Sequence, residues 1–257
     1  MNITIINDCK DDNAKARQLA RVSSILKYPT NFIGVSNELE ASGNIIDTLD
    51  ANQNSAGIIL VNVAPRNGKA KKHINGTPFG YFWYKKTLVV SSIDGLTLSL
   101  VKKLGVTAYI NVLDIPQTLE ILIKNKKLPQ NLKYHIVNSQ FRSYEYLPRI
   151  ATFIFKNKKI KNKQININTI ADAPSAIWWI DNFGNCKTTI LLEELNNRKL
   201  SIHRKKLKYF ARMKDVPNKK PGIIIGSSGL NEKRFLEIVI QGDNAAKNFS
   251  LSSGEKF

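Results

Sequence analysis

Carboxylate and amide side chains follow short apolar segments at several points of this 257-residue sequence. Asp8 comes directly after the apolar run Asn2–Asn7, and a carboxylate there can accept hydrogen bonds from both hydroxyls of a ribose. A helical pattern begins just after it, preceded also by Asp11, Asp12 and Asn13, so a helix N-cap explains these residues equally well. The local sequence leaves both interpretations open.

A second group of polar residues lies in two glycine-containing turns of the C-terminal part. After the apolar segment IWWI, Asp181 and Asn185 flank Phe183, and an aromatic ring beside an amide suits a purine base. Further on, Ser227 and Ser228 stand in the segment GSSG, which suits a ligand loop. An ordinary β-turn and an ordinary hairpin are the alternative interpretations of these two segments.

The motifs of the common cofactor and metal chemistries do not occur in the sequence: there is no GxGxxG, Walker loop, HExxH or GxSxG. His73, His135 and His203 are isolated, so we interpret each as a surface or structural residue and expect no metal site. Cys9 and Cys186 lie far apart, which fits a reducing compartment better than a disulfide framework. The polar groups that remain stand at strand ends, where an open α/β sheet binds its ligands.

The chain is strongly basic, with 39 Lys and Arg residues against 20 Asp and Glu residues and a net charge of +19. Such a charge attracts polyanions, nucleic acid among them. The lysines are spread along the whole chain, however, as in an ordinary enzyme whose gene has a biased base composition, and we favour that interpretation. The dense run Lys156–Gln164 lacks aromatic residues for base stacking and is interpreted as a solvated linker, whereas His203–Lys208 precedes Tyr209 and Phe210 and leaves a nucleic-acid contact open.

The composition indicates a folded protein, since 42% of the residues are hydrophobic and 9% are aromatic. No segment approaches the roughly 20 consecutive apolar residues of a membrane-spanning helix. The N-terminal sequence lacks the basic flank and long apolar core of a secretory signal. We therefore expect a cytoplasmic protein without a membrane partner.

The pattern of apolar residues predicts an α/β fold with two domains. Strand and helix patterns alternate over residues 1–160, which favours a mostly parallel sheet. Residues 161–257 contain short strand candidates without a long helix and form a smaller β-rich domain. The predicted N-terminal strands are Asn2–Asn7, Asn31–Val35, Gly57–Val63, Phe79–Trp83 and Thr87–Ser91, the helices Ala14–Leu26, Ala41–Leu49 and Leu96–Leu104, and the C-terminal strands Ile165–Ile170, Ala176–Ile180, Lys187–Leu191, Gly222–Ile225 and Phe235–Ile240.

In order and wording, four segments resemble the S-adenosyl-L-methionine (SAM) hydroxide adenosyltransferases, a family that also includes enzymes that halogenate SAM. The segments are Asn7–Asn13, Ser91–Leu96, Ile180–Asn185 and Ser227–Ala246, and the resemblance covers essentially the whole chain. It implies an N-terminal α/β domain, a C-terminal β-barrel-like domain and a homotrimer that binds its substrate between subunits. It also implies SAM as the substrate and no separate cofactor.

The resemblance also implies roles for individual residues. Asp8 would hold the ribose hydroxyls, with Asn13 in the same matching segment. Asn185 would bind the adenine edge and Asp181 the methionine ammonium, while Phe183 would pack on the adenosine. The rest of the pocket would consist of Ser227, Glu237 and Ile240, together with Ser228, which stands where halogenating relatives have an arginine that grips the methionine carboxylate.

The sequence departs from the family at the positions of its hydrolytic residues. Asn62 occupies the position of an aspartate, Lys69 or Lys71 that of a basic residue, and Phe141 that of a histidine, while Ser139 remains as a hydroxyl. An amide cannot act as a carboxylate base, and a phenyl ring cannot relay a proton. Asn62, Lys69 and Ser139 are therefore the catalytic candidates of an altered site.

Three functions are compatible with these residues. In the first, which we favour, the protein cleaves SAM to adenosine and methionine by attack of water on the ribose C5′, with Arg66, Lys69 and Arg142 holding an anion or polarising water. In the second, it binds SAM or adenosine without turnover. In the third, which we favour least, the basic surface binds nucleic acid.

Overall fold

The computed structural model describes residues 1–64, 77–138, 142–156, 160, 162–195, 199–203 and 205–257. The chain forms two compact units, Met1–Ala171 and Asp172–Phe257. The division falls later than the boundary at residue 160 that the sequence suggests. The physical reason is β7 (Lys163–Asn166), a strand that pairs antiparallel with β6 (Tyr109–Leu113) and so completes the first sheet instead of opening the second domain. Lys163 and Gln164 therefore belong to a strand and not to a linker.

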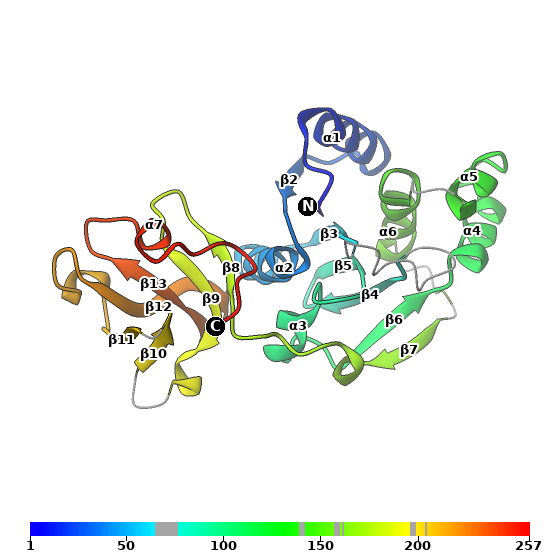
Figure 1. Cartoon of the computed structure of the whole chain (residues 1–257). Coiled ribbons are helices and arrows are strands. Elements are labelled where there is room, and N and C mark those ends of the chain that lie inside the picture. The colour runs from blue at the N-terminus through cyan, green and yellow to red at the C-terminus, as the bar shows by residue number, and fades with distance from the viewer. Residues whose placement is uncertain (65–76, 139–141, 157–159, 161, 196–198, 204) are drawn as a thin grey trace. The chain divides into compact units, whose positions relative to one another are not determined.

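Among the described residues of the first unit, seven strands form one mixed sheet (Figure 1). Its order is β2-β1-β3-β5-β4-β6-β7, and the first four of these strands are parallel. This confirms the predicted α/β class with a mostly parallel sheet. The strands not yet given are β1 (Asn2–Asn7), β2 (Thr30–Gly34), β3 (Gly57–Asn62), β4 (Phe79–Tyr84) and β5 (Thr87–Ser92).

Helices cover both faces of the parallel part of this sheet. Because strand side chains alternate between faces, Ile3, Ile58 and Leu88 join one core cluster with residues of α1 (Asp12–Leu26) and α6 (Leu147–Phe155). On the other side, α2 (Glu38–Asn52) packs on β1, β3 and α3 (Ser99–Lys103). Burial on both faces explains why β3 and β5 are continuous apolar runs.

Three further helices lie between β6 and β7, where the sequence pattern gives no prediction. They are α4 (Ile115–Lys124), α5 (Leu132–Asn138) and α6, and a π-helical turn, Arg142–Tyr146, leads into α6. Asp114 caps α4 by accepting a 2.9 Å hydrogen bond from the Gln117 backbone N–H. Within the described part of the chain, no helix is long and apolar enough to cross a bilayer.

The second unit is a smaller antiparallel β domain (Figure 1). Its described strands form a four-stranded sheet in the order β12-β13-β9-β8 and a separate β10-β11 hairpin. The sheet strands are β8 (Ile177–Ile180), β9 (Cys186–Leu191), β12 (Pro221–Leu230) and β13 (Lys233–Ile240), the hairpin strands are β10 (Lys199–Ile202) and β11 (Lys205–Lys208), and α7 is Ala245–Phe249.

Candidate functional site

Asp8 and Asn62 lie next to each other at the carboxyl edge of the parallel sheet. Strands β1 and β3 are parallel and in register from Asn2 and Gly57 to Asn7 and Asn62, so both strands end at the same level. The Asp8 backbone N–H donates to the Asn62 carbonyl at 3.4 Å. The Asp8 carboxylate accepts from the Ala64 backbone N–H at 3.3 Å. The side chains of Asp8 and Asn62 are both half-buried, as expected for groups at the rim of a ligand crevice.

The structure tests the helix-cap interpretation of Asp8, while its role in ribose binding stays a prediction. The N-cap of α1 is Asp11, whose carboxylate accepts from the Ala14 backbone N–H at 2.9 Å. Asp8 therefore does not serve as this cap, and its carboxylate is oriented by a residue of the neighbouring strand's loop instead. Asn13, predicted in the same group, lies on the exposed surface of the first turn of α1.

A network of buried polar side chains at the ends of β1 and β5, which sequence reasoning missed, stabilises this edge of the sheet. The Asn7 amide is buried, donates to Gln18 Oε1 at 2.9 Å and accepts from the Cys9 backbone N–H at 2.9 Å. The Ser92 hydroxyl, at the end of β5, accepts from the Val63 N–H at 3.2 Å and donates to the Val63 carbonyl at 2.8 Å. Because buried polar groups are costly unless paired, these bonds hold the loops after β1 and β3 in place. The polar types of Asn7 and Ser92 inside apolar strands were the available signal.

The segment after β5 is a tight turn fixed by a carboxylate of α2. The Leu96 backbone N–H donates to Glu38 Oε2 at 2.8 Å. Gly95 has a φ of +64°, and a Cβ there would lie 2.2 Å from the same carboxylate oxygen. The segment that resembles the family at Ser91–Leu96 therefore requires glycine for both backbone conformation and space.

The remaining N-terminal candidates lie partly inside and partly outside the described residues. Lys69, Ser139, Arg66 and Phe141 lie outside them. Arg142 is buried, and its guanidinium donates to the carbonyls of Ile136 at 3.4 Å and Val137 at 3.2 Å, at the end of α5. Burial lowers the pKa of this guanidinium, while the nearby Tyr146 raises it by a smaller amount. The structure thus gives Arg142 a helix-capping contact.

In the second unit, Asp181 and Asn185 are brought together by the turn between β8 and β9. Asp181 Oδ1 accepts from the backbone N–H groups of Phe183 and Asn185, both at 2.9 Å, and Oδ2 accepts from the Asn185 side-chain amide at 2.9 Å. Phe183 stands at the tip of this turn with 70% of its surface exposed. The turn thus carries an exposed phenyl ring two positions before Asn185, and the contact with a purine base that the sequence suggests stays a prediction.

The two candidate serines lie in an irregular part of β12. The pairing of β12 with β13 shifts between Ile225 and Gly229, so Ser227 and Ser228 fall in a bulge. The Ser227 N–H donates to Glu237 Oε1 at 3.4 Å, while the buried Ser228 hydroxyl accepts from Lys187 Nζ at 2.6 Å. Ser227, Ser228 and Glu237 are therefore brought together, and the structure adds Lys187, which the sequence alone does not single out.

Lys187 is positioned by an aromatic neighbour as well as by the serine. Its ammonium group lies 5.4 Å from the centroid of the Trp178 ring, within cation–π range. Lys187 pairs with Glu237 in the register of β9 and β13. The side chain thus carries a positive charge to the bulge. Ile240, by contrast, is buried in the hydrophobic core of this unit, 4% exposed.

The described residues of the basic segment, His203 and Lys205–Lys208, belong to the β10-β11 hairpin. Lys205 and Lys208 place their ammonium groups over the rings of Phe249 and Phe210, at 5.2 Å and 5.7 Å from the ring centroids. His203 Nε2 lies 2.9 Å from Glu255 Oε1. These contacts stabilise the domain itself, and nucleic-acid binding here stays a prediction. In the part of the chain that the structure describes, no group of three or more His, Cys, Asp or Glu side chains is arranged to hold a metal ion.

The structure defines a class of fold: an α/β domain with polar side chains at the carboxyl edge of its parallel strands, followed by a small antiparallel β domain. Residues 175–257 match the family model of the SAM hydroxide adenosyltransferase C-terminal domain. The resemblance of the chain to this SAM-related enzyme family is therefore confirmed, through its C-terminal domain.

Solved structures support the same fold over the whole chain. An uncharacterized conserved protein from Thermotoga maritima is 16% identical, with a TM-score of 0.69 over 98% of this chain and 97% of that one. A conserved hypothetical protein from Thermus thermophilus is 14% identical, with a TM-score of 0.57 over the same shares. At this identity the likeness concerns the fold alone. A search of curated proteins finds no match.

Proposed function

We propose that the protein binds SAM and cleaves it to adenosine and L-methionine. The observation that carries this proposal is the half-buried carboxylate of Asp8 at the edge of the sheet. It accepts a hydrogen bond from the Ala64 N–H, and the N-cap of α1 is Asp11 and not Asp8. Two oxygens on one carboxylate match two adjacent ribose hydroxyls. The match of residues 175–257 to the SAM hydroxide adenosyltransferase C-terminal domain supports SAM as the nucleoside.

The reaction would be a displacement at the ribose C5′. A water oxygen forms the new C5′–O bond while the C5′–S bond breaks, methionine leaves with the electron pair of that bond, and the water loses a proton to solvent. Because a sulfonium is already a good leaving group, positioning of the water supplies much of the catalysis. Asn62 ends β3 and its backbone carbonyl accepts from the Asp8 N–H, so we propose its side-chain amide as the described group that would orient this water, with Lys69 and Ser139 as further candidates.

The C-terminal residues would bind the two ends of the substrate. Phe183 would pack on the adenosine, with Asn185 at the adenine edge and Asp181 at the methionine ammonium. Ser227, Ser228 and Glu237 would form the rest of the pocket, with Ile240 behind them in the core. We propose that the protein is a homotrimer in which N-terminal residues of one subunit and C-terminal residues of another bind the same substrate. Light scattering on the purified protein tests this by measuring the mass of the assembly.

The Lys187 ammonium would take the place of the arginine that halogenating relatives have at the position of Ser228. The position of Ser228 carries an arginine in halogenating relatives, and here the Lys187 ammonium lies 2.6 Å from the Ser228 hydroxyl. A lysine held this way presents a point charge to a carboxylate while the serine hydroxyl orients it. Lys187→Gln should therefore weaken SAM binding about tenfold and adenosine binding little, because adenosine has no carboxylate. Lys233→Gln, an exposed lysine of the same sheet, is the matched control.

The test is incubation of the purified full-length protein with SAM, in chloride and in chloride-free buffer, followed by liquid chromatography with mass detection. We expect adenosine and methionine in both buffers. The Asp8→Ala variant should lose product formation and SAM binding while its melting temperature without ligand stays within error of the parent. Asp12→Ala, an exposed carboxylate in the first turn of α1, should keep both. Normal SAM binding by Asp8→Ala would remove the assignment of the ribose site.

A second candidate function is binding of SAM or adenosine without turnover. It is favoured by Asn62, since an amide cannot accept the proton of the attacking water. It is also favoured by Arg142, whose guanidinium is engaged with the carbonyls of Ile136 and Val137. Unchanged SAM after long incubation, together with a measurable affinity in calorimetry, would establish this function in place of hydrolysis.

A further inference from the structure

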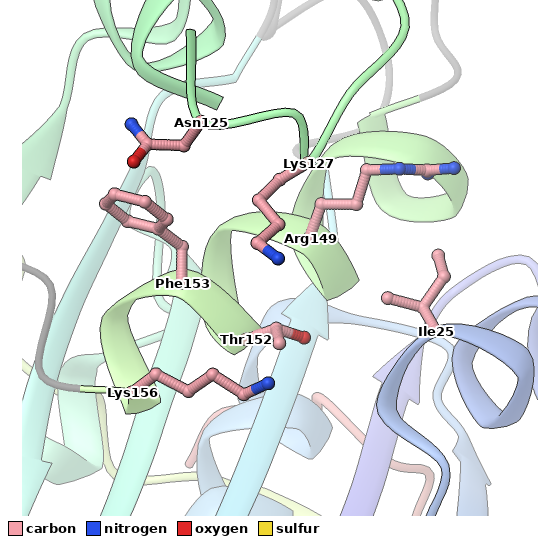
Figure 2. A pocket seen from close by; sticks show the side chains of 7 residues that line it. All are labelled: Ile25, Asn125, Lys127, Arg149, Thr152, Phe153 and Lys156. Carbon is pink, nitrogen blue, oxygen red and sulfur yellow. The ribbon is translucent and has the colours of Figure 1, made fainter. Parts of the chain in front are cut away.

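The first unit contains a recess whose lining includes none of the candidate site residues described above. It has a volume of about 190 Å³ and is lined by Ile25, Asn125, Lys127, Arg149, Thr152, Phe153 and Lys156 (Figure 2). None of these residues belongs to the sheet edge at Asp8. The volume is below the roughly 300–1,000 Å³ of pockets for drug-sized ligands, so an occupant would be small.

One face of α6 supplies most of the lining. Arg149, Thr152, Phe153 and Lys156 follow the spacing i, i+3, i+4 and i+7, which places them in one stripe on a helix. A surface helix normally presents such a stripe to the core, and here Phe153 does lie in the core, 6% exposed. The two ends of the stripe are cationic instead.

The end of α4 supplies the opposite side of the recess. The helix stops at Asn125, Lys126 has a φ of +55°, and the backbone N–H of Lys127 donates to the Leu122 carbonyl at 2.8 Å. This 6→1 bond beside a left-handed residue is a Schellman cap, which fixes the direction in which Lys127 leaves the helix. Figure 2 shows the side chains of Lys127 and Lys156 both directed toward Thr152.

The charge of the recess is positive after the ion pairs are taken into account. The Arg149 guanidinium donates to the Glu145 carboxylate and, at 2.8 Å, to the Glu145 carbonyl, and Glu145 also pairs with Arg21 at 3.1 Å. Among the described residues, no carboxylate is paired with Lys127 or Lys156. Two lysines therefore line the recess without an ion-pair partner among the residues that the structure describes.

Apolar residues also line the recess. Ile25 near the end of α1 and the buried ring of Phe153 line it together with the methylene stems of the lysines. A lysine near a helix C-terminus is favourable for each helix separately, because it offsets the negative end of the helix dipole. That effect does not explain why two such lysines line the same recess together with Ile25 and Phe153.

We propose that this recess binds a small organic anion. A phosphate or carboxylate head would be held by the ammonium groups of Lys127 and Lys156, and an apolar body would lie against Ile25 and Phe153. Thr152 donates its hydroxyl to the Pro148 carbonyl at 2.7 Å, so it bounds the site without donating to the anion. The site is separate from the proposed SAM cleavage, and its test does not depend on that activity.

Calorimetry of the full-length protein at about 0.15 M NaCl tests the proposal with three probes, since salt at this level screens contacts with the general surface. Phenyl phosphate carries both the head and the body, inorganic phosphate the head alone, and phenol the body alone. We expect phenyl phosphate to bind at least about tenfold more tightly than either fragment. Benzoate in place of phenyl phosphate distinguishes a carboxylate head from a phosphate head.

A pair of charge-matched variants locates the binding. Lys127→Gln combined with Lys156→Gln should lower the affinity for phenyl phosphate at least about tenfold. Lys86→Gln combined with Lys124→Gln changes the net charge equally at exposed lysines outside the recess and should leave the affinity unchanged. All four lysines are exposed, so both variants should keep the melting temperature of the parent. Equal loss in the two variants, equal affinity for the three probes or no binding by the parent would each overturn the proposal.

Discussion

Two aspartates of this protein follow apolar strands, yet their carboxylates serve different purposes. Asp8, after β1, accepts a 3.3 Å hydrogen bond from Ala64, a residue of the loop after another strand. Asp181, after β8, accepts from Phe183 and Asn185 and so closes its own turn. The same residue type in the same local position is thus tied to distant structure in one domain and to its own neighbours in the other.

The difference lies in how the two sheets are connected. Parallel strands end at a common edge, so the segments that directly follow β1, β3 and β5 begin at the same edge of the sheet. Antiparallel neighbours such as β8 and β9 are joined directly by a short turn, which must satisfy its own backbone groups. We therefore expect the turn at Asp181 to be sensitive in stability and the edge at Asp8 to be sensitive in binding.

The largest expected effect on stability comes from Gly184→Ala in this turn. Gly184 has a φ of +85°, and a Cβ there would lie 2.1 Å from Asn244 Cγ. The Asn244 side chain cannot move away cheaply, because it caps α7 through a 2.7 Å bond from the Lys247 N–H. Left-handed strain of about 1 kcal/mol and displacement of the cap together should lower the free energy of unfolding by roughly 3 kcal/mol, measured by urea denaturation.

Gly105→Ala is the matched control for backbone strain alone. Gly105 also has a left-handed φ, +67°, but nothing lies within 4 Å of the position of its Cβ. It should cost only about 1 kcal/mol. Equal losses for the two variants would show that Asn244 does not restrict the turn.

The next largest effect separates the two aspartates themselves. Asp181→Ala removes three hydrogen bonds of 2.9 Å and should lower the free energy of unfolding by about 2 kcal/mol. Asp8→Ala removes the 3.3 Å bond from Ala64 at a half-buried position and should cost less than about 1 kcal/mol. Equal destabilisation, measured by denaturation without ligand, would contradict the expectation that Asp181 contributes more to folding than Asp8 does.

The sequence predicts the parallel strands well because they are buried on both faces. Runs such as Gly57–Asn62 contain apolar residues without interruption, and little else in a protein requires that pattern. The turn Asp181–Asn185 is predicted equally well, because Asp181 accepts hydrogen bonds from backbone N–H groups of the same turn and glycine is common in such turns. The C-terminal half of the family resemblance rests on such local patterns.

Other features depend on contacts between distant residues and left no local pattern. Strand β7 is highly polar, and only its pairing with β6 shows that it belongs to the first domain. The N-cap of α1 is Asp11, three positions after Asp8. Several carboxylates and amides follow one another in this part of the sequence, so their spacing alone does not show which of them caps the helix. Lys187 becomes a candidate site residue only through its hydrogen bond to Ser228, which lies 41 positions later in the chain.

A smaller effect is expected from Asn62→Asp at the sheet edge. A carboxylate at this position accepts the proton of the attacking water, which the amide of Asn62 cannot do. The variant should hydrolyse SAM about tenfold faster than the parent, which corresponds to about 1.4 kcal/mol in the barrier. Asn62→Ala should not accelerate the reaction, and an unchanged rate in Asn62→Asp would remove Asn62 from the position of the base.

The smallest effect on stability concerns the two cysteines, one beside each aspartate region. Cys9 follows Asp8 and is exposed, whereas Cys186 follows Asn185 and is buried. Burial, with smaller contributions from Asp181, Glu255 and Glu237, raises the pKa of the Cys186 thiol to about 12. At pH 8 this thiol is protonated and inaccessible, so a thiol reagent such as dithionitrobenzoate should modify Cys9 alone in the folded protein and both cysteines after unfolding.

Substitution of the two thiols by hydroxyls extends the same comparison to stability. Cys186→Ser places a hydroxyl in an apolar core and should cost about 1 kcal/mol, while Cys9→Ser at the exposed position should cost nothing measurable. Because the raised pKa favours the neutral thiol in the folded state, the stability that Cys186 contributes is complete below the thiol's ordinary pKa and declines as the pH rises toward 12. Rapid labelling of Cys186 in the folded protein at pH 8 would mean that the turn at Asp181 opens readily. It would contradict the expectation that Cys186 is protected and Cys9 is not.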